Sequence, residues 1–250
     1  MRLGVIADIH GNASALRAVL AKLKDLGCDR IVDLGDCLSG PLDADETADI
    51  LLEHNFLTVR GNHDRQLIDQ HPEAMGPSDL AARSLLHDKH LDWLHTLPFH
   101  AQFDDVYLCH ATPRKDSQYL LETVIPISGE VRLASQGEMR ARLGPLPDGV
   151  TLVLHGHTHI PRLVSIDGRL LVNPGSVGLP AYDATSTATH FMETASPHAR
   201  FAVLDRVQGQ WRAEFHAIEY DWDKAAALAT SRKRDDWAHA LATGFALRHA

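Results

Sequence analysis

The sequence predicts an α/β protein, and three observations support this fold class. Apolar runs typical of buried strands alternate with amphipathic segments in the first third of the chain. The chain has 250 residues and is 44% hydrophobic, which suffices for one substantial core. Two later hairpins, at 161–173 and 201–217, suggest a second β-sheet. The first three strands alone would also fit a single doubly wound sheet.

The first third of the chain contains three predicted strands and two predicted helices. The strands are expected at 2–8, 30–36 and 56–62. The first helix, at 12–27, carries apolar side chains at helical spacing, namely Leu16, Val19, Leu20, Leu23 and Leu26. In the second helix, at 43–55, Asp43 can cap the N-terminus and Glu46 lies three residues on, as in a capping box. Such strand–helix–strand units imply a parallel sheet covered by helices.

The middle of the chain is less regular. Residues 64–97 are expected to be mostly helical, with a turn at Gly76-Pro77. Residues 99–111 resemble a hairpin that turns at Asp104-Asp105. Within the irregular stretch 112–150, a helix is expected at 130–144.

The last hundred residues begin with a short apolar strand at 151–154 and a hairpin that turns at Asp167-Gly168. The polar stretch 181–200 is expected to be a surface loop. A final hairpin at 201–218 turns at Gln208-Gly209, and the alanine-rich residues from Asp223 onward are expected to be helical.

The composition and charge of the chain restrict its expected cellular location and its expected binding partners. The formal charge of −9 repels long polyanions, so stable nucleic-acid binding is not expected, although a small phosphate ester fits a locally positive pocket. No apolar run is long enough to cross a bilayer, and the N-terminus lacks the features of a signal peptide. Three cysteines at unpatterned spacings indicate reduced thiols. We therefore expect a cytoplasmic protein without membrane contact.

Metal-ligating residue types follow five apolar runs at the point where each run ends. They are Asp8 and His10, then Asp36, then Asn62, His63 and Asp64, then His110, and finally His155, His157 and His159. In open α/β sheets, ligands bind just beyond the carboxyl ends of the strands. Turns usually use Gly, Pro, Ser and Asn and seldom use histidine. Five such endings therefore indicate a shared site better than they indicate local turn chemistry.

The donor types indicate a metal centre. Imidazole, carboxylate and amide donors without a thiolate suit Mn(II), Fe, Zn, Co or Ni. There are more donors than one ion needs, so two ions that share a bridging carboxylate would use them all. Two metals about 3.5–4 Å apart can clamp a phosphoryl group, and Asp36 is the natural bridge.

The ordered blocks "DIH", "GDC", "RGNHD", "CHA" and "HGHTH" between residues 8 and 159 resemble the signature of the calcineurin-like metallophosphoesterase superfamily. The later "NPGSVGLP" at 173–180 is similar to the small bacterial phosphodiesterase-like branch. This resemblance implies a four-layer αββα sandwich, in which two mixed β-sheets face each other and helices flank them.

The resemblance also implies a role for each matching residue. Asp8, His10 and His159 would hold one metal, Asn62, His110 and His157 would hold the second, and Asp36 would bridge them. The ions would be divalent or trivalent, with manganese favoured and iron, zinc, nickel or cobalt as alternatives. His63 would lie beside the substrate and either stabilise the phosphoryl group or protonate the leaving oxygen, which imidazole can do because it titrates near neutral pH.

The expected activity is hydrolysis of a small phosphate ester by metal-bound hydroxide. A phosphodiester or nucleotide-type substrate is favoured by similarity to small bacterial members. Phosphomonoesters, phosphoproteins and dinucleoside polyphosphates remain alternatives. A metal-binding scaffold without catalysis is the alternative from a different class, and the acidic charge disfavours a nuclease.

The expected organisation is one metallophosphoesterase domain at 1–220, with insertions at 112–150 and 178–200 near the site. A C-terminal helical extension at 221–250 would pack on the same domain, and its exposed faces could support a homodimer. The motif does not use His155, which we interpret as structural or as orienting a ligand. Asp64 could pair with His63 or with Arg65, or could suit an N-terminal helix position on its own. Arg60 and Arg114 could contact a phosphate oxygen or be solvated surface residues. The role of the 178–200 loop stays open.

Overall fold

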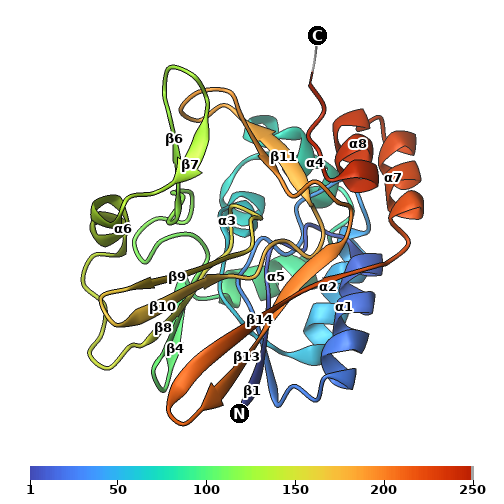
Figure 1. Ribbon diagram of the computed structural model, residues 1–250. Coiled ribbons are helices and arrows are strands. Elements are labelled where there is room, and N and C mark those ends of the chain that lie inside the picture. Colours follow the sequence, from blue (N-terminus) through green and yellow to red (C-terminus); the bar gives the residue numbers. More distant parts are fainter. Residues whose placement is uncertain (249–250) are drawn as a thin grey trace.

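The structure is a computed structural model that describes residues 1–248, and its centre is a pair of five-stranded mixed β-sheets (Figure 1). The two sheets face each other, and helices lie outside them. This arrangement confirms the predicted sandwich of two mixed sheets flanked by helices.

The first sheet has the strand order β14-β13-β1-β2-β3. Its parallel strands are β1 (Arg2–Ile6), β2 (Arg30–Asp33) and β3 (Leu57–Thr58). The other two are β13 (Ala199–Val207) and β14 (Gln210–Ile218), and β13 runs antiparallel to β1. The late hairpin therefore extends the first sheet, and its assignment to a second sheet was wrong. Most of β13 is buried on both faces, which suits a strand inside a covered sheet.

The second sheet has the order β4-β5-β8-β10-β9. Its strands are β4 (His100–Phe103), β5 (Val106–Cys109), β8 (Leu152–Leu154), β9 (Arg162–Ile166) and β10 (Arg169–Asn173). β5, β8 and β10 are parallel to one another, whereas β4 and β9 are antiparallel edge strands. The carboxyl ends of the parallel strands in both sheets deliver the loops that form the site.

Apolar side chains fill the space between the two sheets. Val5 and Val32 from the first sheet belong to one buried cluster with Leu108 and Leu154 from the second. Alternate residues of the same strands face the helices, as the period of two requires. This buried core holds the two sheets in one orientation.

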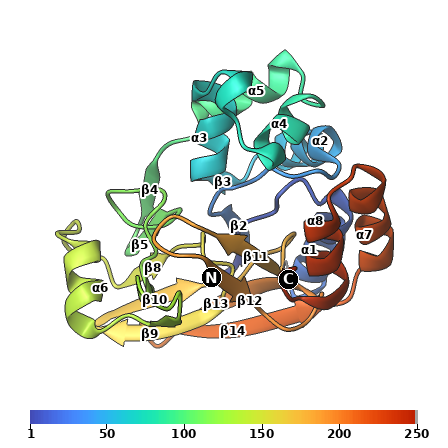
Figure 2. The same ribbon diagram turned by 90° about the horizontal axis from the view of Figure 1, so that it is seen from above.

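Helices cover the outer faces of both sheets (Figure 2). The first sheet is covered by α1 (Ala13–Asp25), α2 (Ala44–His54), α3 (Asn62–Asp69), α4 (Pro77–Arg83) and α5 (Asp88–Thr96), with a short 3-10 turn at Pro72–Ala74. The second sheet packs against α6 (Gln136–Leu143) through Met139 and Leu143.

Two local predictions about helix starts were wrong. Asp43 precedes α2, but its side chain makes no capping hydrogen bond, and Glu46 instead accepts hydrogen bonds from Arg17. In the stretch 130–144, residues Val131–Leu133 form strand β7, and α6 starts only after Ser135. Ser135 and Glu138 form a reciprocal capping box, which is the sequence signal for the true start.

The 178–200 segment is not only a loop, contrary to the prediction for 181–200. It contains the hairpin β11 (Ala181–Ala184) and β12 (His190–Glu193). Alternate burial of His190 and Met192 is the period-two signal that the polar composition obscured. A second small hairpin, β6 (Glu122–Val124) with β7, lies in the 112–150 segment.

The C-terminal segment forms two helices, α7 (Trp222–Ser231) and α8 (Asp235–Thr243), which pack against each other, and α8 lies beside β11 (Figure 1). They share a buried cluster with Leu42, Leu179 and Ala181. The homodimer expected through this segment stays a prediction. No helix in residues 1–248 is both long enough and apolar enough to cross a membrane.

Candidate metal centre

Six of the seven predicted ligands lie in two groups of three in the loops that follow the strands. One group is Asp8, His10 and His159; the other is Asp36, His110 and His157. Within each group the donor atoms all lie within 4.8 Å of one another. The seventh, Asn62, starts α3 and places its Oδ1 3.2 Å from His110 Nε2.

The backbone turns sharply at five of these ligand positions. Positive φ angles occur at Asp8 (53°), His10 (52°), Asp36 (56°), His157 (71°) and His159 (60°). Only a few per cent of non-glycine residues adopt this left-handed conformation, which costs roughly 1–2 kcal/mol per residue. Such clusters of strained residues occur at functional sites, where the surrounding structure holds them in place.

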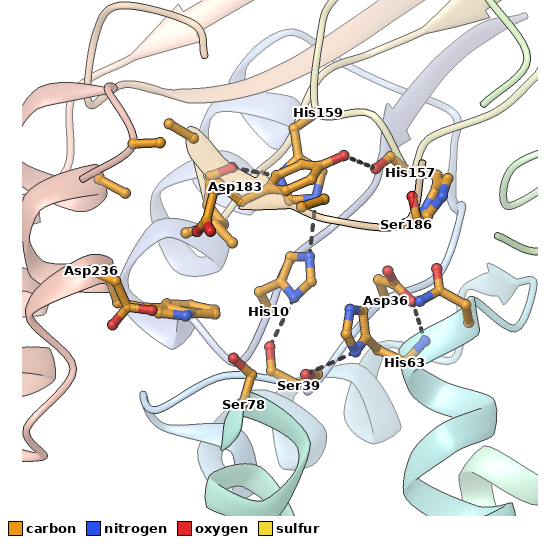
Figure 3. Close-up of a pocket in the computed structure, with 18 of the residues that line it drawn as sticks. His10, Asp36, Ser39, His63, Ser78, His157, His159, Asp183, Ser186 and Asp236 are labelled. Carbon is orange, nitrogen blue, oxygen red and sulfur yellow. Dashed lines mark hydrogen bonds between the residues drawn. The ribbon is translucent and has the colours of Figure 1, made fainter. Parts of the chain in front are cut away.

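Two ring nitrogens in the first group face each other without a proton between them. His10 Nδ1 lies 2.8 Å from the Ser39 carbonyl, and His159 Nδ1 lies 2.7 Å from the Leu179 carbonyl. Each Nδ1 must therefore carry the proton and donate it, because a carbonyl only accepts. The two Nε2 atoms are then unprotonated, yet they lie only 3.1 Å apart (Figure 3). A cation coordinated by both lone pairs resolves this repulsion.

In the second group, His110 has a supporting carbonyl of the same kind, whereas His157 turns its Nδ1 inward. His110 Nδ1 is 2.8 Å from the Leu34 carbonyl, so its Nε2 faces Asp36 Oδ2 at 3.2 Å and His157 Nδ1 at 3.3 Å. If the Asn62 amide were rotated, its nitrogen would lie 3.0 Å from His157 Nδ1. The orientation with the oxygen inward is therefore the one that suits a cation.

Charges within the site act strongly on one another. Burial raises the pKa of Asp8 well above its usual range. Burial also opposes ionisation of Asp36, but the positive charge of His110 outweighs it and holds the Asp36 pKa well below its usual range. Burial lowers the pKa of His10 to about 4 and that of His157 to about 3. These two imidazoles are neutral near pH 7, the form that binds a metal. Burial opposes protonation of His110 too, but the charge of Asp36 outweighs it and raises the pKa of His110 to about 10, so a bound metal would have to displace the His110 proton.

Asp64 holds two of the ligand loops together. Its buried carboxylate accepts hydrogen bonds from the backbone N–H groups of Asp36 (2.8 Å), Cys37 (2.9 Å) and Gly61 (2.9 Å). The carboxylate thus pairs with neither His63 nor Arg65. It connects the loop after β2 to the start of α3, and so it positions Asp36 relative to Asn62.

Replacing Asp64 by asparagine should destabilise the protein by about 2–4 kcal/mol, because the amide keeps one acceptor oxygen but turns its NH2 group toward a backbone N–H that has lost its acceptor. Urea unfolding in a chelating buffer measures the loss. Asp92→Asn, an exposed position on α5, is the matched control and should change stability by less than about 0.5 kcal/mol. Equal stability of the two variants would contradict this role for Asp64.

His63 lies at the edge of the two groups, and its partner is a residue that the sequence did not reveal. His63 Nδ1 lies 2.8 Å from Oδ1 of Asp79 on α4, whose side chain is 4% exposed. Burial opposes protonation of the ring, but the charge of Asp36 and the hydrogen bond to Asp79 outweigh it and raise the pKa of His63 to about 9. The ring is 32% exposed, so a protonated Nε2 is available to a bound molecule.

A cavity of about 400 Å³ opens over the two groups, within the usual range for small-molecule sites. Figure 3 shows His63 and Asp36 on one side of it and Asp183 and Asp236 on the other. Tyr119, Tyr182, Trp237, Leu179, Ala181 and Ala240 supply aromatic and apolar walls. Trp237 and Ala240 belong to α8, so the C-terminal segment forms part of the cavity. The sequence contained no motif that indicated this.

Three residues whose role the sequence left open, His155, Arg60 and Arg114, lie outside the two ligand groups and the cavity lining. His155 is fully buried, belongs to neither group, and has no hydrogen-bond partner on either ring nitrogen. Neither Arg60 nor Arg114 lines the cavity, and Arg114 donates to the Ala141 carbonyl. Phosphate binding by these two arginines therefore has no support in the structure.

Comparisons with known proteins agree with this geometry. Residues 1–195 match the family model for the calcineurin-like phosphoesterase superfamily domain. An uncharacterised protein of Methanocaldococcus jannaschii is 25% identical over an alignment of 261 positions, and this alignment covers 94% of each chain.

Two solved structures share the fold across nearly the whole chain. A metallophosphoesterase from Sphaerobacter thermophilus is 23% identical with a TM-score of 0.71, and the match covers 98% of this chain and 99% of that chain. A hypothetical protein from Pyrococcus horikoshii OT3 is 19% identical with a TM-score of 0.73 and coverage of 97% and 98%.

Proposed function

Because the chain belongs to the calcineurin-like phosphoesterase superfamily, we propose that it hydrolyses small phosphodiesters with the help of two divalent metal ions. The observation that carries this proposal is the close approach of His10 Nε2 and His159 Nε2, two lone pairs at 3.1 Å. Without a metal ion here, the fold would hold two repelling lone pairs together with no compensating interaction. Manganese is our first choice, because the donors are imidazole, carboxylate and amide oxygen.

Each residue has a defined task in the proposed reaction. When bound, the two ions supply positive charge for the phosphoryl oxygens and an acidified water for the attack. Asp36 belongs to the second group and, as a carboxylate with two oxygens, would contribute to both ions. His63 holds a proton on Nε2 and donates it to the leaving oxygen. Asp79 accepts from Nδ1 and thereby fixes which way the ring points.

The walls of the cavity favour a substrate with a single negative charge. Arg234 is the one lysine or arginine among the described residues that line the cavity. It is already bound to Asp236 by two hydrogen bonds, of 2.9 and 2.6 Å. Away from the metal groups, Asp183 adds a further negative charge. Additional phosphates would thus meet carboxylates instead of free cations, which disfavours dinucleoside polyphosphates relative to a diester.

The test is turnover of bis-p-nitrophenyl phosphate by purified protein before and after metal removal. We expect activity in Mn(II), its loss after treatment with EDTA, and its return when Mn(II) is added again. Metal analysis should find two ions per chain. Because ligands that bind only the folded state stabilise it, the melting temperature should rise with Mn(II).

Two outcomes would point elsewhere. Two bound ions without turnover of any phosphate ester would favour the metal-binding scaffold. Faster turnover of p-nitrophenyl phosphate or of a dinucleoside polyphosphate than of the diester would contradict the proposed substrate class while leaving the metal centre intact.

A further inference from the structure

Strand β14 is the free edge of the first sheet. It pairs only with β13, and it is nine residues long, which exceeds the usual strand length of about 5–6 residues. The other edge strands of the two large sheets are shorter: β3 has two residues, β4 has four and β9 has five. β14 thus offers the longest row of unpaired backbone groups at these sheet edges.

This edge lacks the usual protection against pairing. Natural edge strands carry proline, lysine, bulges or inward-pointing charges. Gln210–Ile218 contains no proline, lysine or glycine. Its charged side chains, Arg212 and Glu214, are exposed, and Phe215 is 38% exposed. In residues 1–248, no strand other than β13 pairs with β14.

We propose that two copies of this chain pair antiparallel through β14 and join their first sheets into one continuous sheet. In a symmetric pair centred on Ala213, Arg212 lies opposite Glu214 of the second copy, and this contact occurs twice. Trp211 then lies opposite Phe215 of the second copy, also twice. Opposite charges and aromatic pairs are the cross-strand contacts that stabilise antiparallel strands.

Neighbouring registers are less favourable. Centring the pair on Arg212 places two arginines opposite each other, and centring it on Glu214 places two glutamates there; like charges in this position destabilise the pair. A register centred between two neighbouring residues would place side chains from different faces of the two sheets opposite each other. The sequence of β14 therefore favours one register of self-pairing. Because no residue of β14 lines the cavity, this surface can be varied without altering the site.

Charge reversal tests the interface. Wild-type protein should sediment in analytical ultracentrifugation at twice the chain mass of 27.5 kDa. Arg212→Glu or Glu214→Arg alone should raise the dimer dissociation constant by roughly tenfold or more, because two attractive pairs become repulsive. The double variant Arg212→Glu/Glu214→Arg restores opposite charges and should restore the dimer. Recovery in the double variant also shows that the single variants are not simply misfolded.

Cross-linking tests the register. Opposed residues in an antiparallel pair have Cα atoms about 4.5–5.5 Å apart, within the range for a disulfide. Ala213→Cys should therefore form a covalent dimer on mild oxidation. Ala217→Cys is the matched control, because its copies would be about 27 Å apart, eight residues at about 3.4 Å each. Wild-type protein controls for the free cysteines Cys28, Cys37 and Cys109.

Three results would overturn the proposal: a monomer at all accessible concentrations, a dimer unaffected by both single charge reversals, or equal cross-linking at 213 and 217.

Discussion

Asp36→Asn should lose at least about 10²-fold in turnover of bis-p-nitrophenyl phosphate in Mn(II). Replacing a residue that only supports a metal ligand already lowers affinity or activity by about 10–100-fold, and in the proposed centre Asp36 is itself a ligand shared by both ions. The variant should also bind fewer than two ions per chain. An amide has one oxygen in place of two and no negative charge, so it cannot serve both groups. Metal analysis and steady-state kinetics on the same preparation provide the measurement.

Asp183→Asn is the matched control for this loss. Asp183 is an exposed aspartate on the opposite wall of the same cavity, so its replacement should leave the metal content at two. Thermal unfolding in EDTA checks that both variants are folded. Near-normal turnover of folded Asp36→Asn would refute the bridging role.

Replacing His63 should cause the second large loss of turnover, and the size of this loss should depend on the leaving group of the substrate. His63→Gln should lower turnover of diphenyl phosphate by about 10²–10⁴-fold, the usual contribution of a general acid. The effect on bis-p-nitrophenyl phosphate should be smaller, because p-nitrophenolate leaves more readily without a proton. The two diesters have similar shapes, so the comparison separates proton donation from binding. Equal losses on both substrates would show that His63 does not act as the acid.

Asp79→Asn should change the pH dependence of the same reaction. The proton on His63 is present below its pKa of about 9 and is lost above it, so turnover of diphenyl phosphate should fall as the pH rises past about 9. Asp79 is one of the groups that raise this pKa, so removing its charge lowers the pKa. The falling limb of the pH profile should therefore move to lower pH. Asp92→Asn should leave the limb in place.

The order of the ligand motifs was enough to predict most of the fold. Each motif follows an apolar run. The structure brings Asp8 and Asp36 together because β1 and β2 are parallel, and it brings His110 and His157 together because β5 and β8 are parallel. The two-sheet arrangement followed from the resemblance more than from the hairpins. The hairpin at 201–218 joined the first sheet instead, since strand partners depend on contacts between distant residues that local patterns do not contain.

Parts of the site were not readable from the sequence for the same reason. Asp79 lies 16 residues after His63, in a helix without any motif. Trp237 reaches the cavity only because α8 packs beside β11. Asp64 was visible as the last residue of the "GNHD" motif, but its three backbone partners come from two different loops. Tertiary packing decides each of these contacts.

The five left-handed ligand positions have a consequence for how such a chain can change over generations. At each of them glycine or asparagine would relax the backbone, so many substitutions that abolish metal binding would make the metal-free chain more heat-resistant. Selection for thermal endurance alone would therefore tend to erase these aspartates and histidines. Their joint presence at five strained backbone positions indicates that natural selection has acted on the function of the chain and not only on its stability.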